Sequence, residues 1–351
     1  MSLPATVRAE RLDVRWLLGS IFVLLGAAVA GLIVGPADLP VSGVGKELLD
    51  RLPWIEIDSG LSAIRSNIVW EVRLPRVLLG ALVGASLAIS GAGYQAVFRN
   101  PLADPYLLGA AAGAGLGATI AIVTNLGDGT GVFDAVPVLA FVGAMAAVML
   151  SWSMGRSGDS DRSPATLLLA GVAVASFLTA LQSFVLQRNA DDFRRVFSWI
   201  FGRLNVASWS EVWLLAPYVA VCTFVILLYR RQLDVMRVGD LEAESLGVRP
   251  GRVRAVVIVA ASLCTAAAVA VSGLIGFVGI IVPHFVRLAV GTSNRIVLPL
   301  SVVFGAAFLV ATDLVARTAL APSEVPIGVV TAFFGAPFFV VVLRTSKRAF
   351  G

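Results

Sequence analysis

Residues 73–117, RLPRVLLGALVGASLAISGAGYQAVFRNPLADPYLLGAAAGAGLG, decide the fold of this chain. Two apolar segments, 77–94 and 106–123, lie on either side of a polar elbow at 98–105. The elbow carries charged, amide and proline side chains, namely Arg99, Asn100, Pro101, Asp104 and Pro105. Two more arginines, Arg73 and Arg76, stand at the start of the first segment. The pattern indicates two membrane helices joined by a specific polar turn, and not apolar segments whose only role is to cross the membrane.

The composition of the whole chain extends this interpretation. Of its 351 residues, 58% are hydrophobic and only 14% are charged, and the mean hydropathy is +0.89. Soluble proteins carry about 25% charged residues. So much apolar surface cannot be buried in a water-soluble core, and the sequence therefore predicts a protein that crosses the lipid bilayer several times.

Long, continuously apolar runs predict helices, because only helices and closed barrels satisfy the backbone in lipid. A span needs ~20 apolar residues, and about ten candidates fill most of residues 1–351 as one transmembrane domain. The predicted fold class is an all-α integral membrane protein with spans at 16–34, 77–94, 106–123, 136–152, 165–186, 212–229, 255–271, 274–290, 296–315 and 325–343. Only Ser272 and Gly273 separate the seventh span from the eighth, so this pair also reads as one long run.

Lys and Arg are in excess over Asp and Glu on the side of the two termini, whereas the opposite side has a slight acidic excess. Cytoplasmic loops of membrane proteins carry such a basic excess. We therefore expect both termini to be cytoplasmic, and the chain to be a multi-pass protein of the bacterial inner membrane. The segment before the first span is polar and basic, so no cleavable signal peptide is expected.

Several kinds of chemistry are missing from the sequence. There is no G-x-x-x-x-G-K-[ST] loop, so we expect no nucleotide site in this chain. His284 is the single histidine, and Cys222 and Cys264 lie in apolar segments, which argues against a metal site, a bound cofactor or hydrolytic catalysis. Carboxylates near the membrane midplane are scarce, which disfavours the alternative of an ion-coupled secondary transporter.

The largest internal loop, 230–254, contains a short segment with one weak apolar face. A solvated linker and a helix that contacts a partner protein both remain open on the residues alone. Gly109, Gly113 and Gly117 recur at spacing four, which lets membrane helices approach closely. We expect these glycines to pack helices within one protomer.

Motifs spread over residues 73–343 together resemble the permease subunit of binding-protein-dependent ABC importers for ferric siderophores, haem and cobalamin. They are Arg73-Leu74-Pro75-Arg76, Ser90-Gly91 with Gln95, Arg99-Asn100-Pro101-Leu102-Ala103 with Pro105 and Leu108-Gly109, Leu167-Leu168-Leu169-Ala170-Gly171, Trp199 with Gly202, Gly239-Asp240 with Ala243 and Leu246-Gly247, Gly273 with Gly276-Phe277-Val278-Gly279, Pro283-His284 with Arg287, Leu298-Pro299, Asp313 with Arg317, Glu324 with Pro326 and Gly328, and Gly335-Ala336-Pro337.

The resemblance implies a ten-helix subunit that pairs with a second copy of itself around a central path. It implies two cytoplasmic ATPase subunits, which hold ATP and Mg, and an external substrate-binding protein that delivers the chelate. The subunit would work by alternating access and would not itself be an enzyme. No nucleic acid partner is implied.

The resemblance also assigns roles to single residues. Arg73, Arg76 and Arg317 match external arginines that pair with glutamates of the binding protein; snorkelling at the membrane interface is the other interpretation. Gly239, Asp240, Leu241, Ala243, Leu246 and Gly247 match the helix that couples to the ATPase, where Asp240 could cap the helix and the two leucines fill a groove. Asn100 and Leu102, with Pro164 and Ala165, match the cytoplasmic gate, although a corner that only turns the chain remains the alternative.

The cargo is the least determined feature. We favour a ferric siderophore from the breadth of the family, with cobalamin or haem as alternatives. Arg188, Arg194 and Arg195 are candidates for contacting an anionic cargo, but the sequence does not place them along the path.

Overall fold

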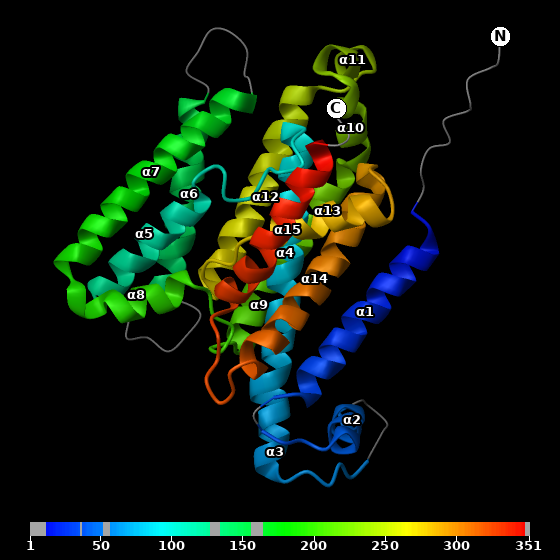
Figure 1. The fold of residues 1–351 in the computed structure, drawn as a ribbon, viewed down its shortest axis with the longest axis vertical. Helices are drawn as coiled ribbons and strands as arrows, with labels where there is room; N and C mark the ends of the chain where they lie inside the picture. The colour runs from blue at the N-terminus through cyan, green and yellow to red at the C-terminus, as the bar shows by residue number, and fades with distance from the viewer. Residues whose placement is uncertain (1–11, 36, 52–56, 127–133, 156–163, 348–351) are drawn as a thin grey trace.

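The computed structural model describes residues 12–35, 37–51, 57–126, 134–155 and 164–347, and in these ranges it contains helices and no strand. Figure 1 shows long helices that run roughly along the long axis of the molecule. The elements are α1 (Val14–Ile33), α2 (Val41–Asp50), α3 (Ala63–Asn67), the π-helix η1 (Ile68–Arg73), α4 (Leu74–Phe98), α5 (Ala110–Val123), α6 (Ala135–Met154), α7 (Pro164–Arg188), η2 (Ala190–Asp192), α8 (Phe193–Ile200), α9 (Trp209–Leu228), α10 (Arg230–Val235), η3 (Met236–Val238), α11 (Asp240–Ser245), α12 (Pro250–Ser272), α13 (Val278–Ala289), α14 (Asn294–Thr318) and α15 (Ile327–Lys347).

Each of the ten predicted segments overlaps one of the apolar helices of the described residues. In the described part of the chain, seven helices are long and apolar enough to span a membrane, and α4 does so as the end of a continuous helix from Ala63 to Phe98. Shorter apolar helices, Ala110–Val123, Val278–Ala289 and Ile327–Val341, fall in the other three predicted segments. Two of these are shorter than predicted because turns occupy residues 106–109 and an irregular segment occupies 273–277. The seventh and eighth segments are thus separate helices.

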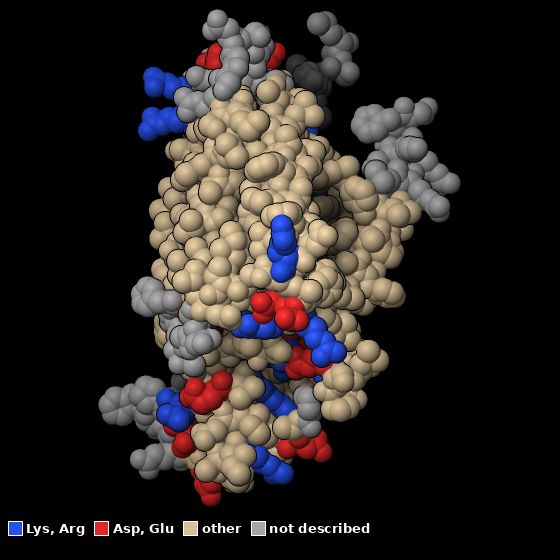
Figure 2. All heavy atoms as spheres, turned by 90° about the vertical axis from the view of Figure 1, so that its left-hand side faces the viewer, with Lys and Arg blue, Asp and Glu red and all other residues tan. Residues whose placement is uncertain are grey.

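In Figure 2 most charged side chains lie at the top and in the lower half of the molecule, and mostly uncharged surface lies between them, interrupted by one basic side chain. Such a surface suits the hydrocarbon layer, where exposed charges are costly. In Figure 1 the start of α1 and the end of α15 both point toward the end that carries α11, away from α2 and α3. The described chain therefore starts and finishes toward one end of the bundle, and its cytoplasmic location remains a prediction.

Helix α4 is the centre of the bundle, and every residue from Val83 to Phe98 is buried. Glycines allow its backbone to touch two neighbours. A Cβ atom at Gly84 would lie 2.2 Å from the carbonyl oxygen of Gly305 in α14, and one at Gly91 would lie 2.1 Å from the carbonyl oxygen of Gly279 in α13. No side chain fits at such separations, so the small residues of α4 fix how closely α13 and α14 pack.

The spaced glycines of α5 act as predicted, within one protomer. A Cβ atom at Gly113 would lie 2.1 Å from the carbonyl oxygen of Gly143, and one at Gly117 would lie 2.0 Å from that of Leu139. Both partners belong to α6. Gly109 differs, because it precedes α5 with φ of 83° and serves the turn.

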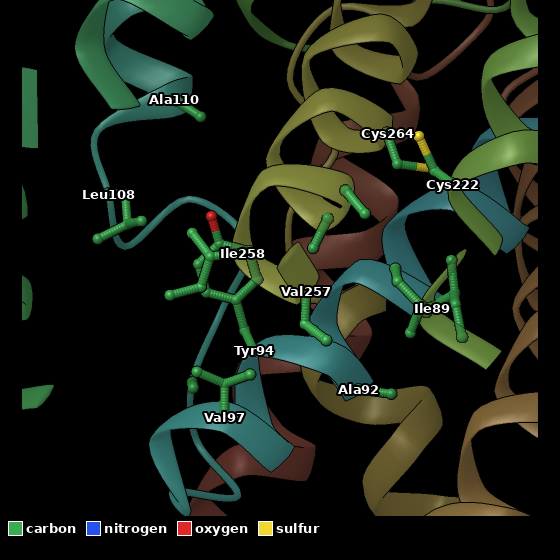
Figure 3. Packing of buried hydrophobic residues seen from close by; sticks show 14 of the residues in the cluster. Ile89, Ala92, Tyr94, Val97, Leu108, Ala110, Cys222, Val257, Ile258 and Cys264 are labelled. Carbon is green, nitrogen blue, oxygen red and sulfur yellow. The ribbon is translucent and has the colours of Figure 1, made fainter. Parts of the chain in front are cut away.

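Large side chains fill the spaces that the glycines leave. Figure 3 shows Tyr94 of α4 beside Ile258 and Val257 of α12, with Leu108 of the elbow nearby. Tyr94 is fully buried, and its hydroxyl shares a 2.6 Å hydrogen bond with Ser262. Because a buried hydroxyl needs a partner, this bond accounts for a polar group in an otherwise apolar core.

A small lobe made by α2, α3 and η1 extends from the end opposite α11 (Figure 1). Glu47 of α2 organises it by accepting hydrogen bonds from Ser66 at 2.5 Å and from Trp70 at 3.0 Å. Hydrogen bonds from Ser59, Ser66 and Trp70 lower the pKa of Glu47 below its ordinary value. The lobe is therefore tied directly to the start of the α4 rod.

Candidate docking, elbow and coupling sites

Arg76 makes a buried double ion pair at the lobe end of α4. Its guanidinium contacts both oxygens of Asp313 in α14 at 2.8 to 3.1 Å and both oxygens of Glu324 at 2.8 and 3.0 Å. The Arg76 and Asp313 side chains are only 10% and 4% exposed. A planar fork facing two carboxylates satisfies most of its donors in this way.

Arg73 and Arg317 hold the last turn of α1. Arg73 donates to the carbonyls of Leu32 and Ile33, each at 2.6 Å, and to that of Ala37. Arg317 donates to the carbonyl of Gly31 at 2.6 Å, and its Nε lies 3.7 Å from Asp313. The final carbonyls of a helix lack partners within the helix and carry partial negative charge. Two cations therefore complete the end of α1.

All three arginines predicted for docking are thus buried and have partners inside the chain. All three lie at the lobe end of the bundle, which is the end predicted to be external, and none presents a free guanidinium in this conformation. Pairing with the binding protein would require them to leave these partners, and that role remains a prediction.

Arg203, which is absent from the predicted site residues, lines a cavity of about 140 Å³ with Arg76, Asp313 and Glu324. Arg203 sits in the connection between α8 and α9, and burial lowers the pKa of its guanidinium. Within the described ranges it forms no ion pair. The cavity could not be foreseen, because it is assembled from three distant parts of the chain.

The elbow after α4 is tightly structured. Arg99 adopts the left-handed conformation with φ of 50° and its N–H bonds to the carbonyl of Gln95, which ends the helix. Asn100 accepts the N–H of Leu102 at 2.9 Å through its side chain, and Asp104 accepts the N–H of Tyr106 at 2.8 Å. Two short polar side chains thus build the turns that redirect the chain toward α5.

The elbow is fastened to the irregular segment before α13. The hydroxyl of Tyr106 donates to the carbonyl of Ile275 at 2.9 Å and accepts its N–H at 3.3 Å. Gln95 donates to the carbonyl of Gly279 at 2.9 Å, and Pro105 packs so closely on Gly279 that a Cβ atom there would be 2.7 Å from it. The non-helical backbone at Ile275 is therefore satisfied by a protein side chain, as lipid requires.

The predicted gate residues come from two separate places. Asn100 is exposed and Leu102 is half-buried at the elbow, whereas Pro164 and Ala165 begin α7. Figure 1 places the start of α7 and the end of α4 toward the same end of the bundle as α11. The Asn100 side chain is used in the turn, which is what the corner interpretation requires, and the gate role stays a prediction.

The predicted coupling segment forms a short helix, α11, between two glycines with positive φ, Gly239 at 142° and Gly247 at 80°. Leu241 and Leu246 are 79% and 67% exposed, while Ala243 is fully buried. The helix therefore anchors itself through Ala243 and presents two leucines outward. The coupling role is a prediction that this arrangement suits.

The capping role expected for Asp240 is wrong. Its carboxylate makes no capping hydrogen bond. It instead binds Arg254 of α12 at 2.6 and 2.8 Å, and it also pairs with Arg99. Two cations outcompete the local backbone donors for the carboxylate. Asp240 thus connects the elbow, α11 and α12.

Comparison with known proteins identifies the family. The model of the FecCD transport family matches residues 22–345. The chain belongs to this family. The cobalamin import system permease protein BtuC of Halobacterium salinarum is 42% identical, over 84% of this chain and 80% of that protein. The vitamin B12 import system permease protein BtuC of Salmonella paratyphi A is 36% identical, over 97% of this chain and 98% of that one.

A solved structure of an ABC transporter is similar to this chain along most of its length. A metal-chelate type ABC transporter in an inward-facing conformation matches with a TM-score of 0.81 and 27% identity, over 95% of this chain and 100% of that one. The FecCD chain is accordingly a multi-pass membrane protein and a permease subunit of a binding-protein-dependent ABC importer, as its motifs predicted. In this family the ATPase is a separate partner.

Of the arginines suggested for cargo contact, Arg188 stacks over Phe184 at 5.7 Å and Arg195 bonds to Asp192 and Asn125, each at 3.1 Å. These local partners neither require nor exclude a position along the path.

Proposed function

We propose that this permease carries cobalamin, or a closely related corrinoid, from an external binding protein to the cytoplasm. The observation that supports this cargo is the similarity to two permeases named for cobalamin and vitamin B12, one of them matched along almost the whole of both chains. The preference for a ferric siderophore drawn from the sequence is not confirmed, and a siderophore is the competitor that an experiment has to exclude.

Transport would proceed by alternating access, with ATP binding and hydrolysis in two partner subunits shifting the populations of the inward-open and outward-open states. The exposed leucines of α11 support a contact with those subunits, because large apolar side chains that project into water at a bundle end suit a partner groove. The ion pair from Asp240 to Arg99 would pass movement of α11 to the elbow.

A second copy of the chain would complete the path. Helices α7 and α15 support this, since they carry exposed large apolar side chains, including Leu169, Phe177 and Phe333. Lipid would cover such faces equally well, so the pairing needs its own measurement, by mass photometry or crosslinking of the purified subunit.

The cargo is tested by uptake. The permease, its ATPase and its cognate binding protein are reconstituted in vesicles and offered cyanocobalamin, haem and a ferric hydroxamate siderophore separately. ATP-dependent accumulation of cyanocobalamin alone is the expected result. Accumulation of the siderophore without cobalamin would overturn the cargo, and accumulation without ATP or the ATPase would overturn the importer mechanism in favour of ion coupling.

A further inference from the structure

A basic cavity of about 320 Å³ lies at the α11 end of the bundle, which the distribution of Lys and Arg predicts to be cytoplasmic. Its walls come from the end of α4, the elbow, η3, α13 and the start of α14. The polar side chains that line it are Gln95, Arg99, Arg237, Arg287, Thr292 and Asn294. Three of these six are arginines, and no carboxylate is among the described residues that line the cavity.

Arg287 is the best-positioned cation of the three. It is half-buried on α13, and its guanidinium donates to the side-chain oxygen of Gln95 at 2.5 Å. Gln95 is itself fixed, because its amide nitrogen donates to the carbonyl of Gly279. In the part of the chain that the structure describes, Arg287 forms no ion pair. A cation held in place by a neutral amide retains donors and charge for a ligand.

The other two arginines lie near carboxylates that also bind other groups. Arg99 pairs with Asp240, which also binds Arg254. Arg237 donates to the carbonyl and the hydroxyl of Thr292, each at 3.1 Å, and lies 4.0 Å from Asp234. The Asp234 carboxylate also accepts from Ser293 and from the N–H of Asn294 and lies 3.8 Å from Arg295. Glu242 is a further acid near Arg99: burial lowers the pKa of the Arg99 guanidinium, and the charge of Glu242 opposes this lowering. Arginines therefore remain in excess around the cavity.

We propose that this cavity binds a phosphate group, presented either by an anionic phospholipid or by free phosphate. Arginines of the elbow, η3 and α13 line the cavity, and a phosphate offers acceptor oxygens on several sides, whereas a carboxylate offers only two. At the level of the inner leaflet, basic pockets between helices meet anionic headgroups. The proposed transport uses Arg99 only through its ion pair with Asp240 and gives no role to Arg237 or Arg287.

The bound anion would connect elements that otherwise meet through few polar bonds. It would bridge the end of α4, which pairs with α11 through Arg99, to α13 and η3. Binding to the folded state alone raises the apparent stability. Occupancy should therefore appear as a rise in melting temperature of the subunit by itself, without cargo or ATPase.

The test uses the purified full chain in a neutral detergent, with unfolding followed by a thiol-reactive dye, since Cys222 and Cys264 are both buried. Inorganic phosphate is titrated against chloride at constant ionic strength. In a second arm, dihexanoyl phosphatidylglycerol is compared with dihexanoyl phosphatidylcholine. Inorganic phosphate and phosphatidylglycerol are each expected to raise the melting temperature saturably. Stabilisation by phosphatidylglycerol but not by inorganic phosphate identifies a lipid headgroup as the source of the bound phosphate.

Arg287→Gln should weaken the apparent affinity at least ~10-fold through loss of a charge-assisted bond. Arg237→Gln, at a more exposed side chain, should also weaken it and decides the matter if Arg287→Gln does not fold. Arg231→Gln is the matched control, because Arg231 is exposed near the same end and does not line the cavity. The site is ruled out if neither anion stabilises the protein, or if Arg287→Gln and Arg237→Gln respond like Arg231→Gln.

Discussion

The guanidinium of Arg76 donates three hydrogen bonds of 2.8 to 3.1 Å to the two carboxylate oxygens of Asp313, a residue 237 positions later in the chain. The pair joins α4 to α14 at the lobe end, and Glu324 adds the segment before α15 to the same guanidinium. This contact is internal to the subunit, so its primary effect should be on stability.

Arg76→Ala should destabilise the isolated permease by about 3–5 kcal/mol, because it leaves two carboxylates, one of them deeply buried, without their cation. Thermal unfolding in detergent, without any binding protein, measures this loss. The double change Arg76→Met with Asp313→Leu should recover only part of the stability, because Glu324 still lacks its cation and Arg317 loses its nearby carboxylate. Unchanged unfolding of Arg76→Ala, combined with weaker docking of the binding protein, would instead assign this arginine to the external interface.

Gly91→Ala should destabilise the bundle by about 1–3 kcal/mol or prevent folding, because the added carbon meets the backbone of Gly279 at 2.1 Å. Gly276→Ala is a suitable control, since a carbon there has no neighbour within 4 Å. Comparison of the two melting temperatures tests the packing of α4 on α13. Equal melting temperatures would show that these helices lie farther apart.

Asp104→Asn should stabilise the protein more at pH 8 than at pH 4.5. Burial raises the pKa of Asp104 to about 6 from an ordinary value of 3.8, so the folded state holds this proton more tightly than the unfolded state. Stability of the wild type therefore falls as the pH rises through this window. Asparagine keeps an acceptor for the N–H of Tyr106, and the gain at pH 8 should be about 1–2 kcal/mol. Melting curves at the two pH values check the sign; an equal effect at both would contradict it.

Leu241→Glu should leave the subunit folded but abolish its association with the ATPase, because the side chain is 79% exposed and its removal opens no cavity. Co-purification of the two subunits measures association, and the melting temperature of the permease alone confirms folding. Leu241→Met retains an apolar side chain and should retain binding. Normal assembly of Leu241→Glu would remove α11 from the coupling interface.

Periodicity and composition were enough to locate the helices, because long, continuously apolar runs satisfy their backbone hydrogen bonds in lipid by forming helices. They were not enough to locate the first residue of α5 or α13. α5 begins late because Asp104 and Gly109 build turns before it, and α13 begins late because Tyr106, 169 positions away, bonds to the irregular backbone of Ile275. The division at residues 273–277 could not be decided from two small residues alone.

The site residues were harder to predict for a related reason. A local motif could place Leu241 and Ala243 on one short helix, but not say that Asp240 would bind Arg254 and Arg99 instead of the helix end. Arg73 and Arg317 were visible as cations near a membrane surface. Their actual partners are the last carbonyls of α1, which no charge pattern reveals.

The glycine contacts of α4 limit where this transporter can move. The backbone of α4 lies against that of α13 at Gly91 and against that of α14 at Gly84. Sliding or rotation between these helices would therefore bring carbonyl oxygens of one helix into collision with atoms of the next. We therefore expect α4, α13 and α14 to travel as one rigid block, while the group α5 to α8 beyond the elbow swings against it. Spin labels should report a constant distance from α4 to α14 and a changing distance from α4 to α7 when nucleotide binds the assembled importer.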